Sequence, residues 1–409
     1  MTQTRDPGTE RLGTAGIAVT AAAMLTNALA YLVPVLAARE LKAPELSALA
    51  TALGLVAIAS VPGVGLQLAV AVHHARHGRS AARRATLITA ILSSGALLAA
   101  TPLLTAGLHL SAEIPALLAV TTAAVVLSSR WLGELQGEQR FLRLAVGMAV
   151  LAAGRYGGVI AGLLLGAGLT GSLLAGALVA GLVPLALARL AVPPAPASAE
   201  SVPAAPSLTA AQVVTGCGAT LAMLVVSYAD LLLARQLLPP AESGAYAVGT
   251  VLTKGALWAP QVVTVLALPR LARGDRRSRM VALAVTGGAG LLLVVASALG
   301  GGLAFRLVGG GDYVHLGAHA PVFAAVGALY ALVFVLLNAQ VAAGARWPAA
   351  PLWAATAGLV VVVLFLAPRS FTGLLWSALG TAVVALVGMG LASRWRREPI
   401  PAGPGPVSP

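Results

Sequence analysis

GLTGSLLAGALVAGLVPLALARL, at residues 168–190, has a single charged side chain, Arg189, close to its end. A helix of about 20 apolar residues crosses the roughly 30 Å of hydrocarbon in a bilayer, so this stretch is predicted to be a transmembrane helix. Further apolar blocks of similar length predict further spans: 13–37, 46–72, 85–108, 114–132, 141–165, 209–237, 243–268, 280–304, 318–343, 348–367 and 371–392. We therefore expect an all-α, polytopic membrane protein with about 12 transmembrane helices.

The segment that follows the quoted span, AVPPAPASAESVPAAPSL at 191–208, is rich in Pro, Ala and Ser. Such a composition favours an extended linker without a core of its own. We expect it to separate an N-terminal six-helix lobe at 13–190 from a C-terminal six-helix lobe at 209–393, with a central cavity between the lobes. The tail at 398–409 is predicted to be disordered.

The composition excludes several classes of protein. The chain of 409 residues is 58% hydrophobic and 10% charged, whereas a soluble domain carries about 25% charged residues. This argues against a soluble enzyme and against a nucleic-acid-binding protein, although the net charge is +13. The lone cysteine, Cys217, excludes a disulfide within the chain and a cysteine-based metal site.

The positive charge falls in short loops and predicts the orientation. With twelve spans both termini share one side, and an N-terminus in the cytoplasm puts 19 basic residues there and five outside. The positive-inside rule then predicts a multi-pass protein of the cytoplasmic membrane with both termini in the cytoplasm. The outer set is Arg39, Lys42, Arg235, Arg306 and Arg369.

The two halves repeat one another at an offset of about 197 residues. An A-R-x-L-x-x-P corner ends both the first and the seventh span, at 38–44 and 234–240. Pro62 and Pro260 occupy matching places in the spans that follow, and an arginine-rich loop comes after each. Six spans per half predict lobes related by an axis along the membrane normal, which is an arrangement typical of transporters.

Five segments together resemble a known family. They are 29–50 with its A-R-x-L corner, Gly63-Val64-Gly65-Leu66-Gln67 followed by 69–76, Leu135-Gln136-Gly137 with Phe141, Tyr228-Ala229-Asp230 through Ser243-Gly244-Ala245-Tyr246, and Leu268-Pro269-Arg270-Leu271. Their order and spacing resemble the polysaccharide-transport branch, the lipid-linked oligosaccharide flippases, of the multidrug/oligosaccharidyl-lipid/polysaccharide exporter superfamily. The resemblance covers roughly residues 20–280.

The resemblance implies a non-enzymatic flippase of an undecaprenyl-pyrophosphate-linked glycan that works by alternating access. Its partners would be the lipid-linked glycan, membrane lipid and a glycan polymerase or glycosyltransferases of the same pathway, without nucleic acid. No cofactor and no metal are implied. The headgroup of such a substrate needs a wet cavity with cationic partners, while its lipid tail can stay in the bilayer.

Three charged residues lie inside predicted spans and are the first site candidates. Arg155 is near the middle of the fifth span, where a charge costs about 2.5–3.5 kcal/mol and is expected to face a cavity or a partner. It can contact substrate phosphate, or it can bond carbonyl groups of a neighbouring helix. Asp230 and Lys254 lie about 12 Å and about 18 Å below the loop that joins their spans, so they can pair across the hairpin or act in the cavity. Asp230 is also the candidate for binding a coupling ion.

Polar residues at span depth provide further candidates. Asn27 and Tyr228 are expected to border the central cleft, because each lies on the first helix of its half. Other such residues line the cavity or tie helices together: Gln67, Tyr156, Gln261, Asn338 and Gln340. Metal binding is not expected at the histidines of 73–77 or at His315 and His319.

Two other functions remain open from the sequence. One is a cation-coupled antiporter of drugs or metabolites, either from the multidrug branch of the same superfamily or of the twelve-helix facilitator type. Arg76-His77-Gly78-Arg79 resembles part of the facilitator motif D-R-x-G-R, but Ala75 stands at the Asp position. The other is a membrane glycan ligase or polymerase, against which the short outer loops argue.

Overall fold

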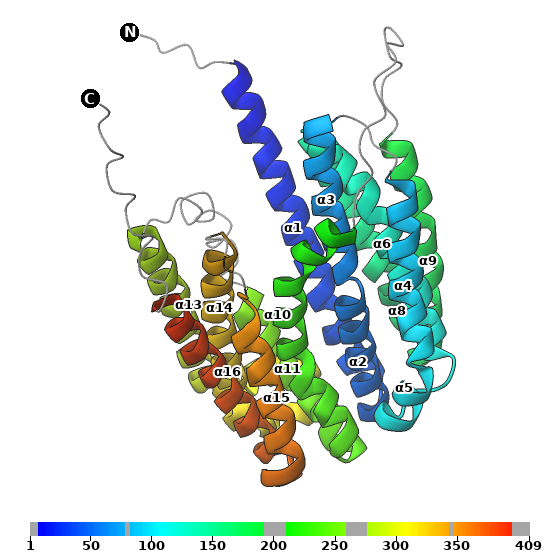
Figure 1. Cartoon of the computed structure of the whole chain (residues 1–409). Coiled ribbons are helices and arrows are strands. Elements are labelled where there is room, and N and C mark those ends of the chain that lie inside the picture. Colours follow the sequence, from blue (N-terminus) through cyan, green and yellow to red (C-terminus); the bar gives the residue numbers. More distant parts are fainter. Residues whose placement is uncertain are drawn as a thin grey trace, which may run out of the picture.

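The chain folds into long helices that lie side by side in two groups (Figure 1). The structure is a computed structural model and describes residues 7–77, 82–191, 210–258, 276–342, 345 and 347–394. Within these ranges there is no β-strand. The predicted linker at 191–208 falls outside the described residues apart from Ala191, and so does the tail at 398–409.

The N-terminal lobe contains the helices up to residue 190. They are α1 (Pro7–Glu40), α2 (Ala43–Ala59), α3 (Val61–His77), α4 (Arg83–Ala99), α5 (Thr101–Leu108), α6 (Ile114–Gly137), α7 (Phe141–Ala152), the π-helical η1 (Ala153–Gly157), α8 (Gly158–Leu164) and α9 (Gly168–Leu190). Helix α6 lies at the centre of this lobe and packs on α3, α4 and α9.

The C-terminal lobe has the corresponding set. Its helices are α10 (Ala210–Leu237), α11 (Pro240–Trp258), α13 (Arg276–Gly309), the 3-10 helix η2 (Gly311–His319), α14 (Ala320–Ala342), α15 (Ala350–Val361), the π-helical η3 (Val362–Leu366) and α16 (Phe371–Arg394). Helix α14 is central here and packs on α13, α11 and α16.

All twelve predicted spans correspond to helices of the structure. Among the described residues, nine helices are long and apolar enough to cross a membrane, and the pair α4–α5, bent by 44°, makes a tenth. The remaining two are α11, whose description ends at Trp258, and the shorter apolar segment Ala350–Leu366. The expected all-α fold of two six-helix lobes is therefore confirmed.

Several spans are broken where the sequence weakens regular α-helix. The second span is interrupted at Ser60, two residues before Pro62, because proline cannot donate the helical hydrogen bond and clashes with the preceding turn. Gly300 leaves helical geometry inside α13, with φ −120° and ψ 22°. The turn between α8 and α9 is tight because Gly166 and Gly168 both have φ near +67°.

Small residues let helices approach closely within a lobe. A Cβ atom on Gly158 or Gly162 of α8 would collide with the backbone of α9, at Ala175 and Ser172. Gly158 and Gly162 therefore form a close-packing ridge against α9.

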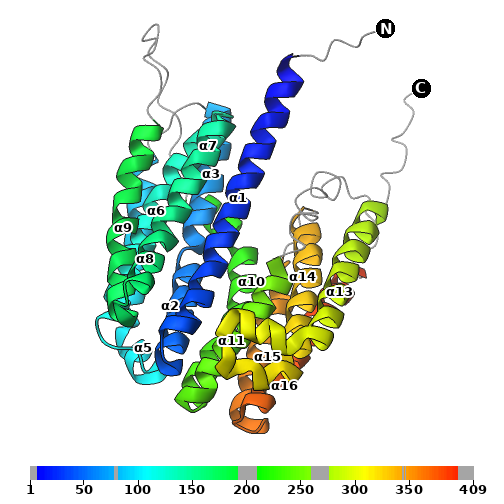
Figure 2. The same cartoon turned by 180° about the vertical axis from the view of Figure 1, so that it is seen from behind.

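The two lobes meet mainly at one end of the bundle, the end with the turns at 40–43, 108–114, 237–240 and 366–371 (Figures 1 and 2). We call it the closed end. A single core of buried apolar side chains from both lobes fills it, including Val33, Leu49, Tyr246 and Phe323. Toward the opposite end, where α9 finishes and α10 begins, the cores are smaller and belong largely to one lobe each. Contact between the lobes continues there through α3 and α10.

Candidate functional site

A cavity of about 380 Å³ lies between the two lobes. Its wall comes from α1, α2, α3, α6, α7 and η1 on one side and from α10 and α11 on the other. Four of the five site residues predicted from the sequence line it: Asn27, Arg155, Tyr228 and Lys254. The fifth, Asp230, does not belong to the lining.

Arg155 reaches the cavity from the π-helical segment η1 in the middle of the fifth span. A π-bulge is uncommon and often accompanies a functional site, because the extra residue redirects a side chain. The guanidinium carbon lies 5.2 Å from the ring centroid of Tyr156. Its Nε–H is buried and has no hydrogen-bond partner in the described part of the chain. The arginine is thus not held by carbonyl groups of a neighbouring helix, which was the alternative interpretation of the sequence.

Lys254 reaches the same cavity from α11 of the other lobe. Its ammonium donates hydrogen bonds to the backbone carbonyl and the hydroxyl of Ser227. It also lies 3.5 Å from the ring centroid of Tyr228, a cation–π contact. Gly54 of α2 packs against that ring, since a Cβ atom there would come within 2.7 Å of it.

Two polar residues of α1 complete this part of the wall. Asn27 lines the cavity, and Tyr31, one helical turn further on, donates a 2.6 Å hydrogen bond to the backbone carbonyl of Lys254. Tyr31 thus joins the first helix of one lobe to the second helix of the other. Tyr31 is not among the residues predicted from the sequence, although its i, i+4 spacing from Asn27 places both on one face of the helix.

Asp230 is buried beside the core of the closed end and has its own partners. Its carboxylate accepts a 3.0 Å hydrogen bond from the hydroxyl of Tyr246 and one of 2.9 Å from the backbone N–H of Leu231. Among the ion pairs of the described residues there is none between Asp230 and Lys254. The pairing across the hairpin, which the sequence left as one possibility, is therefore not formed.

The other polar residues at span depth divide as the sequence suggested. Gln67 and Tyr156 line the cavity, and Gln67 donates to the side chain of Gln136 at 3.1 Å. Gln340 ties α14 to α16 by donating to the carbonyl of Met389, whereas Asn338 donates to the carbonyl of Phe334 in its own helix. Gln261 lies outside the described residues.

The histidines lie away from the cavity. His73 and His74 are buried, and His74 is 3.5 Å from the carboxylate of Glu138. Glu138 comes close because the turn after α6 returns to the end of α3. His319 packs edge-on against Phe371. No group of three or more His, Cys, Asp or Glu side chains suitable for a metal occurs in the ranges that the structure describes.

Arginines join the lobes across the closed end. Arg235 of α10 donates three hydrogen bonds to carbonyl groups of the N-terminal lobe: Leu108 at 2.9 Å, Pro44 at 2.8 Å and His109 at 3.0 Å. Arg39 of α1 donates to the carbonyl of Leu307 in the C-terminal lobe at 3.1 Å.

Small residues of α2 and α11 seal the same end between the arginines. The hydroxyls of Ser47 and Ser243 share a hydrogen bond across the lobes. Gly244 lies so close to Ala43 that a Cβ atom would come within 2.5 Å of it. The cavity is therefore shut off at this end.

The lining of the cavity is largely apolar, and the polar side chains in it are cationic or neutral. Arg155 and Lys254 belong to opposite lobes, and tyrosine, asparagine, glutamine and serine side chains lie between them. Among the described residues that line the cavity there is no carboxylate. Such a site suits an anionic group with hydroxyl or amide neighbours.

Comparison with solved structures gives the fold a precedent. The chain is similar to the lipid II flippase MurJ in its inward closed conformation, with a TM-score of 0.68, 11% identity, and coverage of 92% of this chain and 87% of that one. It is also similar to the eukaryotic MATE transporter AtDTX14, with a TM-score of 0.62, 16% identity, and coverage of 94% and 95%. A multidrug resistance MATE family transporter of the MOP superfamily, in an inward-facing conformation, gives a TM-score of 0.63 at 16% identity over 91% and 93%.

At the level of sequence, no protein-family model and no curated protein matches the chain. The structural matches extend over nearly the whole length of both partners, so the chain has the complete fold of these transporters.

Proposed function

We propose that this protein flips an undecaprenyl-pyrophosphate-linked oligosaccharide or polysaccharide precursor from the inner to the outer leaflet of the cytoplasmic membrane. The observation that carries the proposal is the cavity between the lobes, which receives one cation from each lobe, Arg155 and Lys254, and has no carboxylate among its described lining residues. The fold shared with the lipid II flippase MurJ supports it.

A pyrophosphate fits this pair of cations for a physical reason. An arginine or lysine at mid-membrane depth is costly unless a partner or water stabilises it. The buried, unpartnered Nε–H of Arg155 is a donor of this kind, and guanidinium groups bind phosphate oxygens with good geometry. The hydroxyl and amide groups around it can then bond the first sugars of the glycan.

The two cations also offer a way to couple binding to movement. Because they belong to different lobes, a dianionic group bound between them attracts both lobes and favours their closure around it. The isoprenoid tail needs no cavity, since it can remain in the bilayer while the headgroup crosses.

The proposed orientation follows from the charges. The closed end carries Arg39, Lys42, Arg235 and Arg369, whereas most basic residues belong to the opposite end, so we place the closed end outside and both termini in the cytoplasm. The 191–208 segment would then be a cytoplasmic linker. In this state the substrate enters from the side where glycosyltransferases assemble it, and a glycan polymerase would receive it outside.

A second candidate is a cation-coupled drug or metabolite antiporter. The fold shared with MATE transporters favours it. Two observations favour the flippase instead. A cationic drug has no carboxylate to bind among the described cavity residues, and Asp230, the candidate for ion coupling, is buried beside Tyr246 and away from the cavity.

Proteoliposomes that contain the purified protein test the proposal. The probe is undecaprenyl-pyrophosphate-linked oligosaccharide whose glycan is exposed on one leaflet, and a membrane-impermeant glycosidase reports how much has crossed. We expect transfer with the unaltered protein and loss of at least tenfold in rate with Arg155→Ala. Transfer at the protein-free rate, together with proton- or sodium-driven uptake of ethidium in the same vesicles, would contradict the flippase and support the antiporter.

Two controls keep the test specific. Gln340→Leu removes a buried polar residue that ties α14 to α16 outside the cavity, and its transport should stay within twofold of the unaltered protein provided that it folds. Arg155→Lys keeps the charge but loses the planar donor set, so we expect an intermediate rate.

A further inference from the structure

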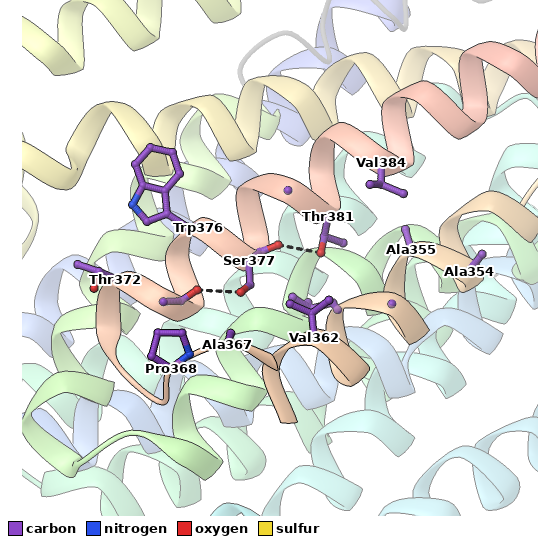
Figure 3. A pocket seen from close by; sticks show the side chains of 14 residues that line it. Ala354, Ala355, Val362, Ala367, Pro368, Thr372, Trp376, Ser377, Thr381 and Val384 are labelled. Carbon is purple, nitrogen blue, oxygen red and sulfur yellow. Dashed lines mark hydrogen bonds between the residues drawn. The ribbon is translucent and has the colours of Figure 1, made fainter. Parts of the chain in front are cut away.

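A second, larger hollow lies between the last two helices. It has a volume of about 770 Å³ and is lined by α15, η3, the turn at 367–368 and the first half of α16. Figure 3 shows Ser377 and Thr381 of α16 across from Val362 at the junction of α15 and η3. We call this hollow the C-terminal groove. It shares no lining residue with the cavity between the lobes.

The groove exists because of the local sequence. Gly358 and Gly380 lie on its two walls, and a Cβ atom built on either would meet no atom within 4 Å. The π-helical segment Val362–Leu366 also displaces the end of α15, since a π-turn inserts an extra residue into the helix. The two helices therefore leave unfilled space where closely packed neighbours would interdigitate.

The lining of the groove is mostly apolar, and two of its three hydroxyl groups, those of Ser377 and Thr381, bond within α16. The hydroxyl of Ser377 donates to the carbonyl of Gly373 at 2.8 Å, and that of Thr381 donates to the carbonyl of Ser377 at 2.9 Å (Figure 3). Both protons are thus used inside α16. A wall of this kind suits hydrocarbon and gives a sugar or a peptide little to bond.

The surroundings of the groove are those of a lipid-facing surface. Large apolar side chains beside it are strongly exposed, with Phe365 at 78%, Leu366 at 75% and Trp376 at 59% of their full area. The stretch of α16 from Thr372 to Val384 is about 18 Å long at 1.5 Å per residue. One leaflet contributes about half of the roughly 30 Å hydrocarbon layer, so the groove has the length of a single leaflet.

A cation stands at the mouth of the groove. Arg369 follows Pro368, a lining residue, in the turn before α16. Its side chain is exposed, and within the described ranges it has no hydrogen bond or ion pair, unlike Arg39 and Arg235 at the same end of the molecule. A phosphate at the membrane surface would be its natural partner.

We propose that the C-terminal groove holds one acyl chain of an anionic phospholipid from the leaflet at the closed end, with the lipid phosphate at Arg369. The length of the groove, which matches a single leaflet, favours a phospholipid acyl chain over a long isoprenoid chain. The groove is also separate from the central cavity, which favours a resident lipid over the transported one. The bound lipid would fill a gap in the C-terminal lobe and stabilise the contact between α15 and α16.

Quenching of tryptophan fluorescence tests this assignment. We would prepare the full chain with Trp376 as its only tryptophan and titrate it in detergent with phosphatidylglycerol carrying a dibrominated acyl chain. We expect quenching that saturates near one lipid per protein. The matched protein with Trp353 as its only tryptophan, which lies outside the groove lining and is 44% exposed, should show quenching that rises with the bulk lipid fraction without saturating.

Variants distinguish lipid binding in the groove from ordinary contact with bulk lipid. Gly380→Leu or Gly358→Leu adds a side chain whose Cβ meets no protein atom within 4 Å, so we expect each to fold and to weaken the saturable quenching at least tenfold. Gly181→Leu, at another glycine whose Cβ would meet no atom, should leave it unchanged. Arg369→Gln should reduce the preference for phosphatidylglycerol over phosphatidylcholine at least threefold.

Several results would overturn the proposal. It fails if Trp376 and Trp353 quench alike, or if both groove-filling variants bind as before while size-exclusion chromatography shows them folded. Displacement of the brominated lipid by equimolar undecaprenyl phosphate would assign the groove to an isoprenoid carrier. Loss of a dimer on groove filling would assign it to a second copy of the chain.

Discussion

Removal of the Arg235 side chain is expected to open the closed end. Its guanidinium donates three hydrogen bonds to the other lobe, of which the one to Leu108 is partly buried and those to Pro44 and His109 are exposed. A hydrogen bond from a charged group contributes about 1.5–3 kcal/mol when shielded and much less when exposed. Two of the acceptors also lie at the C-terminal end of α5, where a helix favours a cation. We estimate that Arg235→Ala removes about 2 kcal/mol of the free energy that stabilises the closed end. Most of this comes from the partly buried bond to Leu108, since exposed bonds contribute little.

This loss of free energy changes the ratio of the outward-open to the closed state. Because about 1.4 kcal/mol corresponds to a factor of ten, Arg235→Ala should shift the equilibrium toward the outward-open state about 30-fold. The lone cysteine, Cys217, can be replaced by Ser to give a cysteine-free background. Ala50, which lines the cavity, then becomes the reporter as Ala50→Cys. Its rate of reaction with a membrane-impermeant maleimide added outside should rise by the same factor.

Comparison among the arginines of this end makes the test specific. Arg39→Ala removes one exposed hydrogen bond, to Leu307, and should raise the labelling rate only a few-fold. Arg306→Ala, at an exposed arginine with no side-chain contact to the other lobe in the described chain, should leave the rate unchanged. Equal rates for all three variants would refute the inference that these contacts hold the lobes together.

Three further predictions concern buried contacts. Asp230→Ala leaves the hydroxyl of Tyr246 without its acceptor, so the protein should lose about 1–3 kcal/mol of stability and unfold at a lower temperature. Asp230→Asn still offers an oxygen and should lose less stability. Exchange of Asp230 and Lys254 should not restore transport to either single variant, because the two are not partners in the structure; recovery in the flippase assay would contradict this. Gly244→Leu should drive α11 away from Ala43 and raise outside labelling of the reporter cysteine; an unchanged rate in a folded variant would show that close approach there is unimportant.

The architecture of this protein could be predicted because its lipid environment leaves few alternatives. A span must be helical and about 20 residues long, so the apolar blocks predicted the helices of the described chain, even the pair separated only by 368–370. The irregular segments were not predictable in the same way. Nothing in the apolar stretch VVLFL or in AGRYG indicates a π-turn, since such turns arise from packing against other helices.

The site residues that could be predicted from the sequence are the charged ones, because the free-energy cost of a charge inside a span restricts where it can lie. A charge inside a span must face a cavity or a partner, and both Arg155 and Lys254 line the cavity. The possible pair of Asp230 and Lys254 rested on depth alone and ignored the direction of each side chain. Residues two apart on a helix point about 200° apart, so Tyr228 in the cavity turns Asp230 away from it. If Tyr228 is assigned to the cavity, the helical spacing alone therefore argues against a pair of Asp230 and Lys254.

The contacts at the closed end follow the internal repeat. Arg39 and Arg235 are 196 residues apart in the sequence, and each donates from the first span of its half to the end of the third span in the other half. The gate at the closed end thus has approximate two-fold symmetry, as rocking of two similar lobes requires.

The cations of the cavity do not follow this symmetry. The positions 197 residues from Arg155 and Lys254 are Leu352 and Ala57, neither of which is charged. The arginine contacts at the closed end thus follow the repeat, whereas the charges of the cavity do not. It follows that substitutions at the corner arginines should change the rate of opening for any substrate, whereas substitutions at Arg155 or Lys254 should change which substrate is carried. A corner variant that altered substrate preference at an unchanged opening rate would contradict this division.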